Sequence, residues 1–159
     1  MWNPKKGFYF DYNYKHKKQE NFFSLAGYYP LWAKVATHMQ AKKLVDNLEV
    51  FEFEGGLANT QSTHLSDEYK QHDYPNGWPQ QQWIVVKGLY NYGFVNRAEQ
   101  IAKKFLDLNK SIMSQTGKLW EKYNVVKRTI SKNERYPTQV GFGWTNAVFI
   151  RLLNKFTGS

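Results

Sequence analysis

Apolar residues recur at intervals of three and four positions in several separate stretches of the sequence. The clearest stretches cover residues 35–48, 82–92, 98–112 and 148–156. This spacing places the apolar side chains on one face of a helix and the polar ones on the other. A further helix is expected over residues 21–32, with Pro30 ending or kinking it. The sequence therefore predicts an all-α fold built from amphipathic helices.

Two local signals bound the central helices. Gly93 follows the 82–92 stretch, where a helix commonly ends in a left-handed residue. Asn96 followed three positions later by Glu99 resembles an N-terminal capping arrangement. We therefore expect one helix to end near Gly93 and the next to begin near Asn96.

Two long segments between the helices, residues 54–78 and 116–144, have a different composition. Both are rich in Gly, Pro, Asn, Gln, Ser and Thr, and both also contain Trp, Tyr and Phe. Loops of this length are functional or disordered more often than they are idle connections, and disordered segments avoid aromatic residues. We therefore expect ordered loops that gather at one end of the helical scaffold.

The composition removes several classes of site. The chain of 159 residues has no cysteine, which excludes disulfides, thiolate zinc sites and cysteine nucleophiles. Its four histidines have no metal-ligand spacing such as H-E-x-x-H. Aromatic residues are abundant, with 6 Trp, 11 Tyr and 11 Phe, and they need a structural or functional explanation.

The net charge of +9 raises the possibility of a nucleic-acid partner. The lysines are scattered as pairs over different expected elements, whereas a nucleic-acid footprint concentrates on one stripe. No apolar run approaches the length of a membrane helix, and the first residues do not resemble a signal peptide. We therefore expect a soluble, cytoplasmic chain with no nucleic-acid and no membrane partner.

The segment 71–78, Gln-His-Asp-Tyr-Pro-Asn-Gly-Trp, joins a carboxylate, amides and an aromatic ring to a strong turn former. The turn at Asn76 would hold Asp73 and Trp78 on one side of the loop. Carboxylates and amides bind sugar hydroxyls, and an aromatic ring covers the C–H face of a pyranose. The alternative is a structural turn whose Trp packs in the core.

A second segment, 119–125, places Glu121 between Trp120 and Lys122 after an expected helix and the turn at Gly117. A carboxylate in such a place could act as a general base. The alternative is an exposed Glu–Lys pair on the surface.

The third segment, 134–146, alternates glycines with rings, including Phe142 and Trp144, just before a helix. Glycines there would let the backbone approach a ligand closely. Packing at the start of the helix explains the same pattern equally well.

Together these segments resemble the trehalases, the inverting glycoside hydrolases that split α,α-trehalose into two glucoses. The family's Q-W-D-x-P-x-G-W motif stands at 71–78 with His72 in place of Trp, E-K-Y stands at 121–123, and G-F-G-W-T-N is intact at 141–146. Weaker matches occur at 7–13, 30–32 and 55–58. Three ordered motifs make this resemblance specific.

The resemblance implies part of an (α/α)₆ toroid, with the loops lining a central pocket. It makes residues 1–159 a single incomplete segment of the catalytic domain, about its last third. It makes Glu121 the general base and requires neither a metal nor a cofactor. The substrate-binding residues that it implies, together with the aromatic pocket-wall candidates, are Asp73, Asn76, Trp78, Trp120, Glu134, Phe142 and Trp144. The partner is a sugar, trehalose or a related α-glucoside.

Three departures from the family accompany the resemblance. The upstream P-G-G-R-F segment and the G-W-D segment that supplies the catalytic acid have no counterpart, so we expect the isolated chain to be inactive. Arg135 aligns with a sugar-binding Glu of the family, and Glu134 stands one position earlier. His72 replaces a Trp. Apolar helix faces that expect neighbours would also be exposed, which predicts self-association.

Two other interpretations stay open at the level of sequence. In one, the chain is a trehalase relic without catalysis that binds a sugar or a partner through its aromatic face. In the other, it is a basic helical module that binds nucleic acid.

Overall fold

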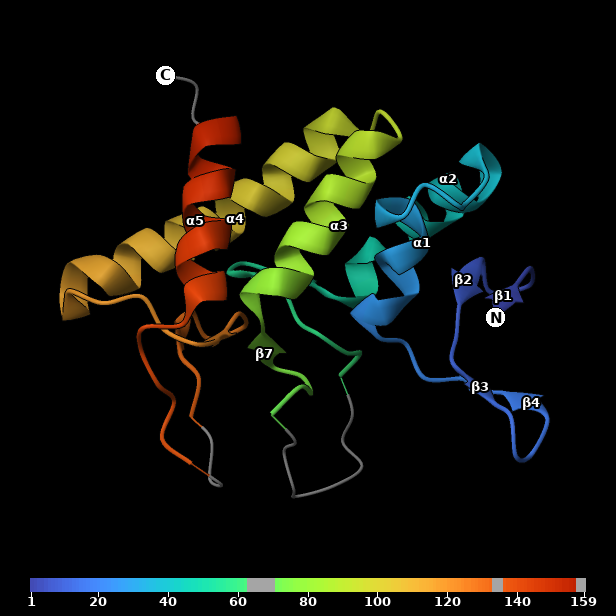
Figure 1. The fold of residues 1–159 in the computed structure, drawn as a ribbon, viewed down its shortest axis with the longest axis horizontal. Coiled ribbons are helices and arrows are strands. Elements are labelled where there is room, and N and C mark those ends of the chain that lie inside the picture. Colours follow the sequence, from blue (N-terminus) through green and yellow to red (C-terminus); the bar gives the residue numbers. More distant parts are fainter. Residues whose placement is uncertain (63–70, 133–135, 157–159) are drawn as a thin grey trace.

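The computed structural model describes residues 1–62, 71–132 and 136–156 of the chain. About half of the chain is helical; α4 crosses behind α5, and the loops around β7 and before α5 hang below the helices (Figure 1). Two 3₁₀ turns, Leu25–Tyr28 and Leu48–Val50, accompany them. The α-helices are α1 Tyr29–Trp32, α2 His38–Asp46, α3 Pro79–Asn91, α4 Val95–Thr116 and α5 Gly143–Phe156.

Helix α3 is the centre of the packing, because it contacts α1, α4 and α5. Its buried face includes Val85, Val86 and Leu89, and the long helix α4 turns Ile101 and Phe105 toward the same core. These residues stand at the three- and four-residue spacing of the sequence, so the prediction of amphipathic helices is confirmed here. Burial of this apolar surface is the main force that holds the helices together.

The prediction of an all-α fold is wrong in one respect, because the chain also forms short two-residue strands. They build small antiparallel sheets that connect loops to one another. Strands of two residues are too short to show an alternating pattern in the sequence. They are β1 Trp2–Asn3, β2 Phe8–Tyr9, β3 Tyr12–Asn13, β4 Lys18–Gln19, β5 Glu52–Phe53, β6 Gly56–Leu57, β7 Asn76–Gly77, β8 Tyr123–Asn124 and β9 Thr129–Ile130.

Three of the hairpins, β1–β2, β3–β4 and β8–β9, share one turn design. Each first strand consists of an aromatic residue followed by Asn, and the Asn side chain accepts hydrogen bonds from backbone N–H groups in the turn. Four residues after the Asn, the backbone has a positive φ, of 62° at Gly7, 50° at Lys17 and 55° at Arg128. Only the first hairpin places glycine there, and the other two hold a basic residue in a conformation that glycine adopts more easily.

Helix boundaries correct three sequence expectations. The segment before Leu25 is not helical, and Pro30 lies in the first turn of α1 instead of ending a helix. Proline suits that position because its missing N–H would have no partner in the first turn. Asn96 does not cap α4, because the helix starts at Val95 with Phe94 before it. Gly93 does follow α3 and has a positive φ of 83°.

The loops that carry the three motifs lie at one end of the helices (Figure 1). The N-terminal ends of α3 and α5 both point to that end, because Trp78 directly precedes α3 and Phe142 directly precedes α5. In the described ranges, no helix has the length and apolar character that crossing a membrane requires.

Candidate functional site

Backbone hydrogen bonds join the three motif segments into one structure. Strand β7 pairs with β8, which brings 71–78 against 121–125. The Val125 N–H also donates to the Pro75 carbonyl at 3.1 Å. On the other side, the Glu121 N–H donates to the Gln139 carbonyl at 2.9 Å. Residues that lie far apart in the sequence therefore form one wall.

Gly77 makes the β7–β8 contact possible. A Cβ at this position would lie 2.4 Å from Val125 Cγ1 and 2.7 Å from the Leu57 carbonyl oxygen. Such distances are far below van der Waals contact, so any other residue would separate the strands. The glycine of the first motif is thus needed to bring that motif against the segment that carries Glu121.

Glu121 is buried, with 4% of its surface exposed, and both of its carboxylate oxygens are hydrogen-bonded. The fully buried Lys122 donates from Nζ to Oε2 at 2.8 Å. The Tyr136 hydroxyl lies 3.0 Å from Oε1. A buried carboxylate needs such partners, because an unpaired charge in the interior is costly. The surface-pair interpretation of Glu121 and Lys122 is therefore wrong.

Tyr136 connects this pair to the first motif. Its hydroxyl accepts a hydrogen bond from Lys122 Nζ at 2.9 Å and lies 2.6 Å from Gln71 Oε1. A phenol carries one hydrogen, so it can serve Glu121 or Gln71 but not both at once. We refer to Gln71, Trp78, Glu121, Lys122, Tyr136 and Trp144 as the pocket wall.

An aromatic row runs across the pocket wall. Phe142 and Trp144 have ring centroids 4.6 Å apart, Trp144 and Trp78 are 5.9 Å apart, and His72 stacks on Trp78 at 4.3 Å. Lys122 Nζ lies 5.1 Å from the Trp78 ring centre. Trp78 is buried whereas Trp144 is 39% exposed, so the row leads from the interior to the surface.

The environment of His72 changes its acid–base behaviour. Burial of the ring, followed by the positive charge of Lys122, lowers the pKa of His72 below its usual value of 6.5. The carboxylates of Asp73 and Glu121 oppose this shift. The neutral imidazole is therefore favoured in the folded chain.

Asp73 and Asn76 shape the turn of the first motif. The Asp73 carbonyl accepts from the Asn76 N–H at 2.9 Å, and Asp73 is partly buried. The buried Asn76 amide donates to the Gln71 carbonyl and accepts from the Ser131 hydroxyl at 2.5 Å. A sugar contact by the Asn76 amide would have to replace these bonds.

Trp120 anchors the segment before Glu121. Its indole N–H donates to Thr116 Oγ1 at 3.2 Å, and its carbonyl accepts from the Thr145 hydroxyl at 2.9 Å. The second bond connects the segment to the start of α5. The sequence-predicted Glu134 and its neighbour Arg135 lie outside the described residues.

Sequence reasoning did not select Gln71, Lys122 and Tyr136 as site residues, although all three stand inside or beside the motifs. Their importance comes from contacts between segments, and no local pattern displays such contacts. The only available signal was that they stand within the three motif segments, 71–78, 119–125 and 134–146.

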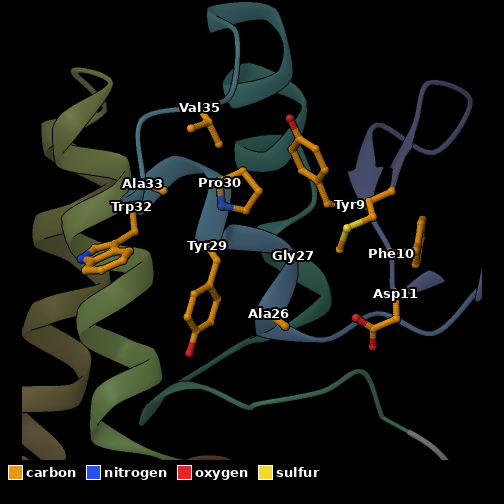
Figure 2. Close-up of a pocket in the computed structure, with 11 residues that line it drawn as sticks. Tyr9, Phe10, Asp11, Ala26, Gly27, Tyr29, Pro30, Trp32, Ala33 and Val35 are labelled. Atoms are coloured by element: carbon orange, nitrogen blue, oxygen red, sulfur yellow. The ribbon is translucent and has the colours of Figure 1, made fainter. Parts of the chain in front are cut away.

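Two cavities lie on the described chain, and of the pocket-wall residues only Gln71 lines either of them. One of about 300 Å³ is lined mainly by apolar residues around α1, among them Tyr9, Pro30 and Val35, with Tyr29 and Trp32 projecting from α1 (Figure 2). The other, of about 900 Å³, lies between the end of α4, the β8–β9 hairpin and residues 71–76. Within the described ranges, no group of three His, Asp or Glu residues could hold a metal ion.

Comparison with known proteins identifies relatives over nearly the whole chain. The family model described as Trehalase matches residues 1–157. The periplasmic trehalase of Escherichia coli O8 (strain IAI1) is 35% identical over 155 residues, and that of Citrobacter koseri is 34% identical. Each alignment covers 97% of this chain and 27% of the relative, so the chain spans about a quarter of these proteins.

Solved structures give the same result. The neutral trehalase Nth1 from Saccharomyces cerevisiae has a TM-score of 0.83 and 35% identity, covering 96% of this chain and 27% of that one. A GH63 mannosylglycerate hydrolase from Thermus thermophilus, solved in complex with glucose, has a TM-score of 0.73 at 22% identity, covering 94% and 36%. The second likeness shows a shared fold only.

The names of the bacterial relatives correct one expectation. We expected a cytoplasmic chain, whereas these relatives are named periplasmic trehalases, so that expectation is wrong. It rested on the lack of a membrane-helix run and on the first residues of the sequence, which do not resemble a signal peptide. Neither feature reports the compartment of a chain that spans about a quarter of its relatives.

Proposed function

This chain belongs to the trehalase family, and from that premise we propose that it is one part of the catalytic domain of a trehalase. In this proposal the domain hydrolyses α,α-trehalose to two glucoses with inversion, and residues 1–159 supply the side of the pocket that holds the base. The complete domain would be an (α/α)₆ toroid. The 27% coverage of the relatives supports an incomplete domain.

One observation carries the proposal, namely the position of Glu121 at the point where the three motif segments meet. It is buried, paired with Lys122 and in contact with Tyr136, beside a row of aromatic rings. An ion pair that served only stability could stand anywhere in the core. This one adjoins an aromatic row that reaches the surface, as a sugar pocket requires.

The proposed chemistry uses Glu121 as the general base. Water attacks the anomeric carbon while Glu121 takes its proton, the glycosidic C–O bond breaks, and the leaving oxygen receives a proton from a second carboxyl group. The two carboxyl groups of an inverting enzyme stand about 6.5–9.5 Å apart, so that the water fits between the base and the sugar. In this proposal the acid comes from residues outside these 159, so the isolated chain is inactive.

Lys122 and Tyr136 would position the base. Lys122 holds Oε2 through its hydrogen bond, while the Tyr136 hydroxyl can turn its single hydrogen from Glu121 to Gln71. When it does so, Glu121 Oε1 becomes free to accept a proton from water. The same network therefore holds the carboxylate and lets it act.

The aromatic row would bind the sugar rings. Trp144, which is 39% exposed, would offer a ring face to C–H groups of the sugar. Phe142, Trp120 and the buried Trp78 would complete the aromatic wall, and Asp73, Asn76 and Glu134 would bind hydroxyls. Trehalose is uncharged, which suits a wall in which the buried charge of Lys122 is already paired. The proposal includes no metal, no cofactor, no nucleic acid and no membrane.

A second candidate is a trehalase relic without catalysis that binds a sugar or a partner. His72 favours this candidate, because it stands where the family has Trp and covers one face of Trp78. Arg135 in place of the family's Glu points the same way. Both changes would weaken sugar contacts without affecting Glu121.

A hybrid enzyme distinguishes the two candidates. In it, this chain replaces the corresponding part of the E. coli periplasmic trehalase. If the chain carries the base, the folded hybrid releases glucose from trehalose, and Glu121→Gln lowers kcat by about 100- to 10,000-fold. Glu99→Gln, an exposed carboxylate on α4, is the matched control and should leave kcat unchanged. A folded hybrid that does not release glucose from trehalose would support the second candidate. Recovery of glucose release in Arg135→Glu would then show that Arg135 causes the loss of activity.

A further inference from the structure

The larger cavity takes its character from the β8–β9 hairpin. Its volume of about 900 Å³ lies within the range that small-molecule sites occupy. The hairpin contributes most of one wall, and the end of α4 and residues 71–76 close the other sides. We call it the hairpin cavity; its described lining residues are Gln71, Tyr74, Pro75, Asn76, Ile112, Gln115, Thr116, Asn124, Val126, Lys127, Arg128, Thr129, Ile130 and Lys132.

Three cations line this cavity. Lys127, Arg128 and Lys132 contribute to the wall, and none of the described lining residues is Asp or Glu. In the described part of the chain, none of the three forms an ion pair, in contrast to Arg97, Lys103 and Lys104 on α4. Like charges gathered in a concave place repel one another and attract an anion.

The hairpin fixes the backbone that carries two of these cations, while their side chains are exposed. Asn124 Oδ1 accepts from the Val126 and Lys127 N–H groups at 3.1 and 2.8 Å, which fixes the turn. Arg128 follows with a φ of 55°, a costly conformation for a residue other than glycine. A turn that is already ordered loses little conformational entropy when a ligand binds to it.

The rest of the lining suits a hydroxylated ring. Thr129 and Gln115 provide hydrogen-bonding groups, while Ile112, Val126 and Ile130 form an apolar strip. Sugars need both kinds of surface. An uncharged sugar, however, does not require three unpaired cations, whereas a phosphate group binds arginine and lysine strongly.

We propose that the hairpin cavity binds a sugar phosphate, with the phosphate held by Lys127, Arg128 and Lys132 and the ring lying on the apolar strip. The cavity does not include Glu121, so this inference is independent of the proposed catalytic role. It borders the pocket wall through Gln71, whose side chain lies 2.6 Å from the Tyr136 hydroxyl.

Titration calorimetry on the full 159-residue chain tests the proposal with four probes, namely glucose 6-phosphate, trehalose 6-phosphate, inorganic phosphate and trehalose. We expect a sugar phosphate to bind more tightly than inorganic phosphate and trehalose, and to shift the amide NMR signals of residues 124–132. Either sugar phosphate supports the proposal, and the comparison of the two reports the size of the sugar. Equal binding of inorganic phosphate, or no binding of either sugar phosphate, overturns it.

The β3–β4 hairpin supplies a matched control, because it has the same turn and the basic residues Lys15 and Lys17 but lines neither cavity. Lys127→Gln and Arg128→Gln should each weaken binding by about tenfold, as loss of one charge-assisted contact does. Lys15→Gln and Lys17→Gln should not. Arg128→Gly relieves the positive φ, so it folds at least as well and should still weaken binding. Equal losses at both hairpins would indicate unspecific attraction, as for a nucleic acid, and contradict the proposal.

Discussion

The pocket wall and the surface around α1 are both rich in aromatic residues, but they use them differently. In the pocket wall, rings surround a buried charged pair, and residues from three segments satisfy the polar atoms of Glu121 and Lys122. We call Tyr29, Trp32, Val35 and Met39 the α1 edge, and there the residues are 38%, 46%, 72% and 78% exposed. The α1 edge has rings and apolar surface without a buried charge.

The two regions differ in whether the chain itself satisfies their side chains. Both side-chain partners of Glu121, Lys122 and Tyr136, lie within the described residues, so these contacts need no further chain. The α1 edge leaves apolar surface uncovered, as expected where a larger domain would continue.

Removing the charge of Lys122 should have the largest effect. Lys122→Met leaves Glu121 as a buried carboxylate without its cation, which should lower the free energy of unfolding by about 3–5 kcal/mol. Urea denaturation followed by circular dichroism measures it. Lys118→Met, at an exposed neighbouring position, should change stability by less than about 0.5 kcal/mol. Similar values for both variants would show that the pair is not buried in solution.

Removing the Tyr136 hydroxyl should have a smaller effect. Tyr136→Phe deletes the hydrogen bonds with Glu121 and Lys122, which should cost about 1.5–3 kcal/mol because both partners are charged. The matched control is Tyr14→Phe, where the residue is 75% exposed. An unchanged urea midpoint for Tyr136→Phe would mean that the hydroxyl does not belong to the network.

Substitutions in the α1 edge should change the self-association of the chain and not its free energy of unfolding. We propose that the isolated chain self-associates through this surface, and Trp32→Ser together with Val35→Ser should shift the mass from light scattering toward the monomer. Their effect on the unfolding free energy should stay small, because both side chains are largely exposed. A wild-type chain that is monomeric at all concentrations would contradict this prediction.

The pH dependence of His72 is the smallest expected effect. Its pKa is lowered in the folded chain, so the unfolded chain binds a proton more readily. The stabilisation is therefore complete above about pH 6.5 and is lost as the pH falls through the lowered pKa of the folded chain. Urea midpoints between about pH 8 and about pH 5 should fall more for the wild type than for His72→Trp, which carries the family residue. An equal pH dependence of the urea midpoint in the wild type and in His72→Trp would refute the lowered pKa of His72.

The sequence predicted the helices where apolar periodicity extended over several turns, as in α4. It missed the hairpins, because two-residue strands carry no alternation and their turns depend on Asn3, Asn13 and Asn124. It placed Pro30 at the end of a helix that in fact begins there. Local signals near a boundary are ambiguous, since proline suits the first turn of a helix as well as the region after its end.

The candidate site shows the same limit. The motifs drew attention to Glu121 and the aromatic residues, whose roles stay predictions, but not to the contacts that surround Glu121. Tyr136 stands 15 positions from Glu121 and 65 from Gln71. Contacts over such separations depend on the pairing of β7 with β8, which no local pattern reveals.

We propose that the pocket wall, and not the α1 edge, faces the sugar. The most direct measurement is the ¹⁵N NMR spectrum of the indole groups of this chain during titration with excess trehalose. The six tryptophans report on both regions, and variants assign their signals. We predict that the signals of Trp78 and Trp144 move while that of Trp32 stays in place. Movement of Trp32 alone, or of none of the six, would contradict the account.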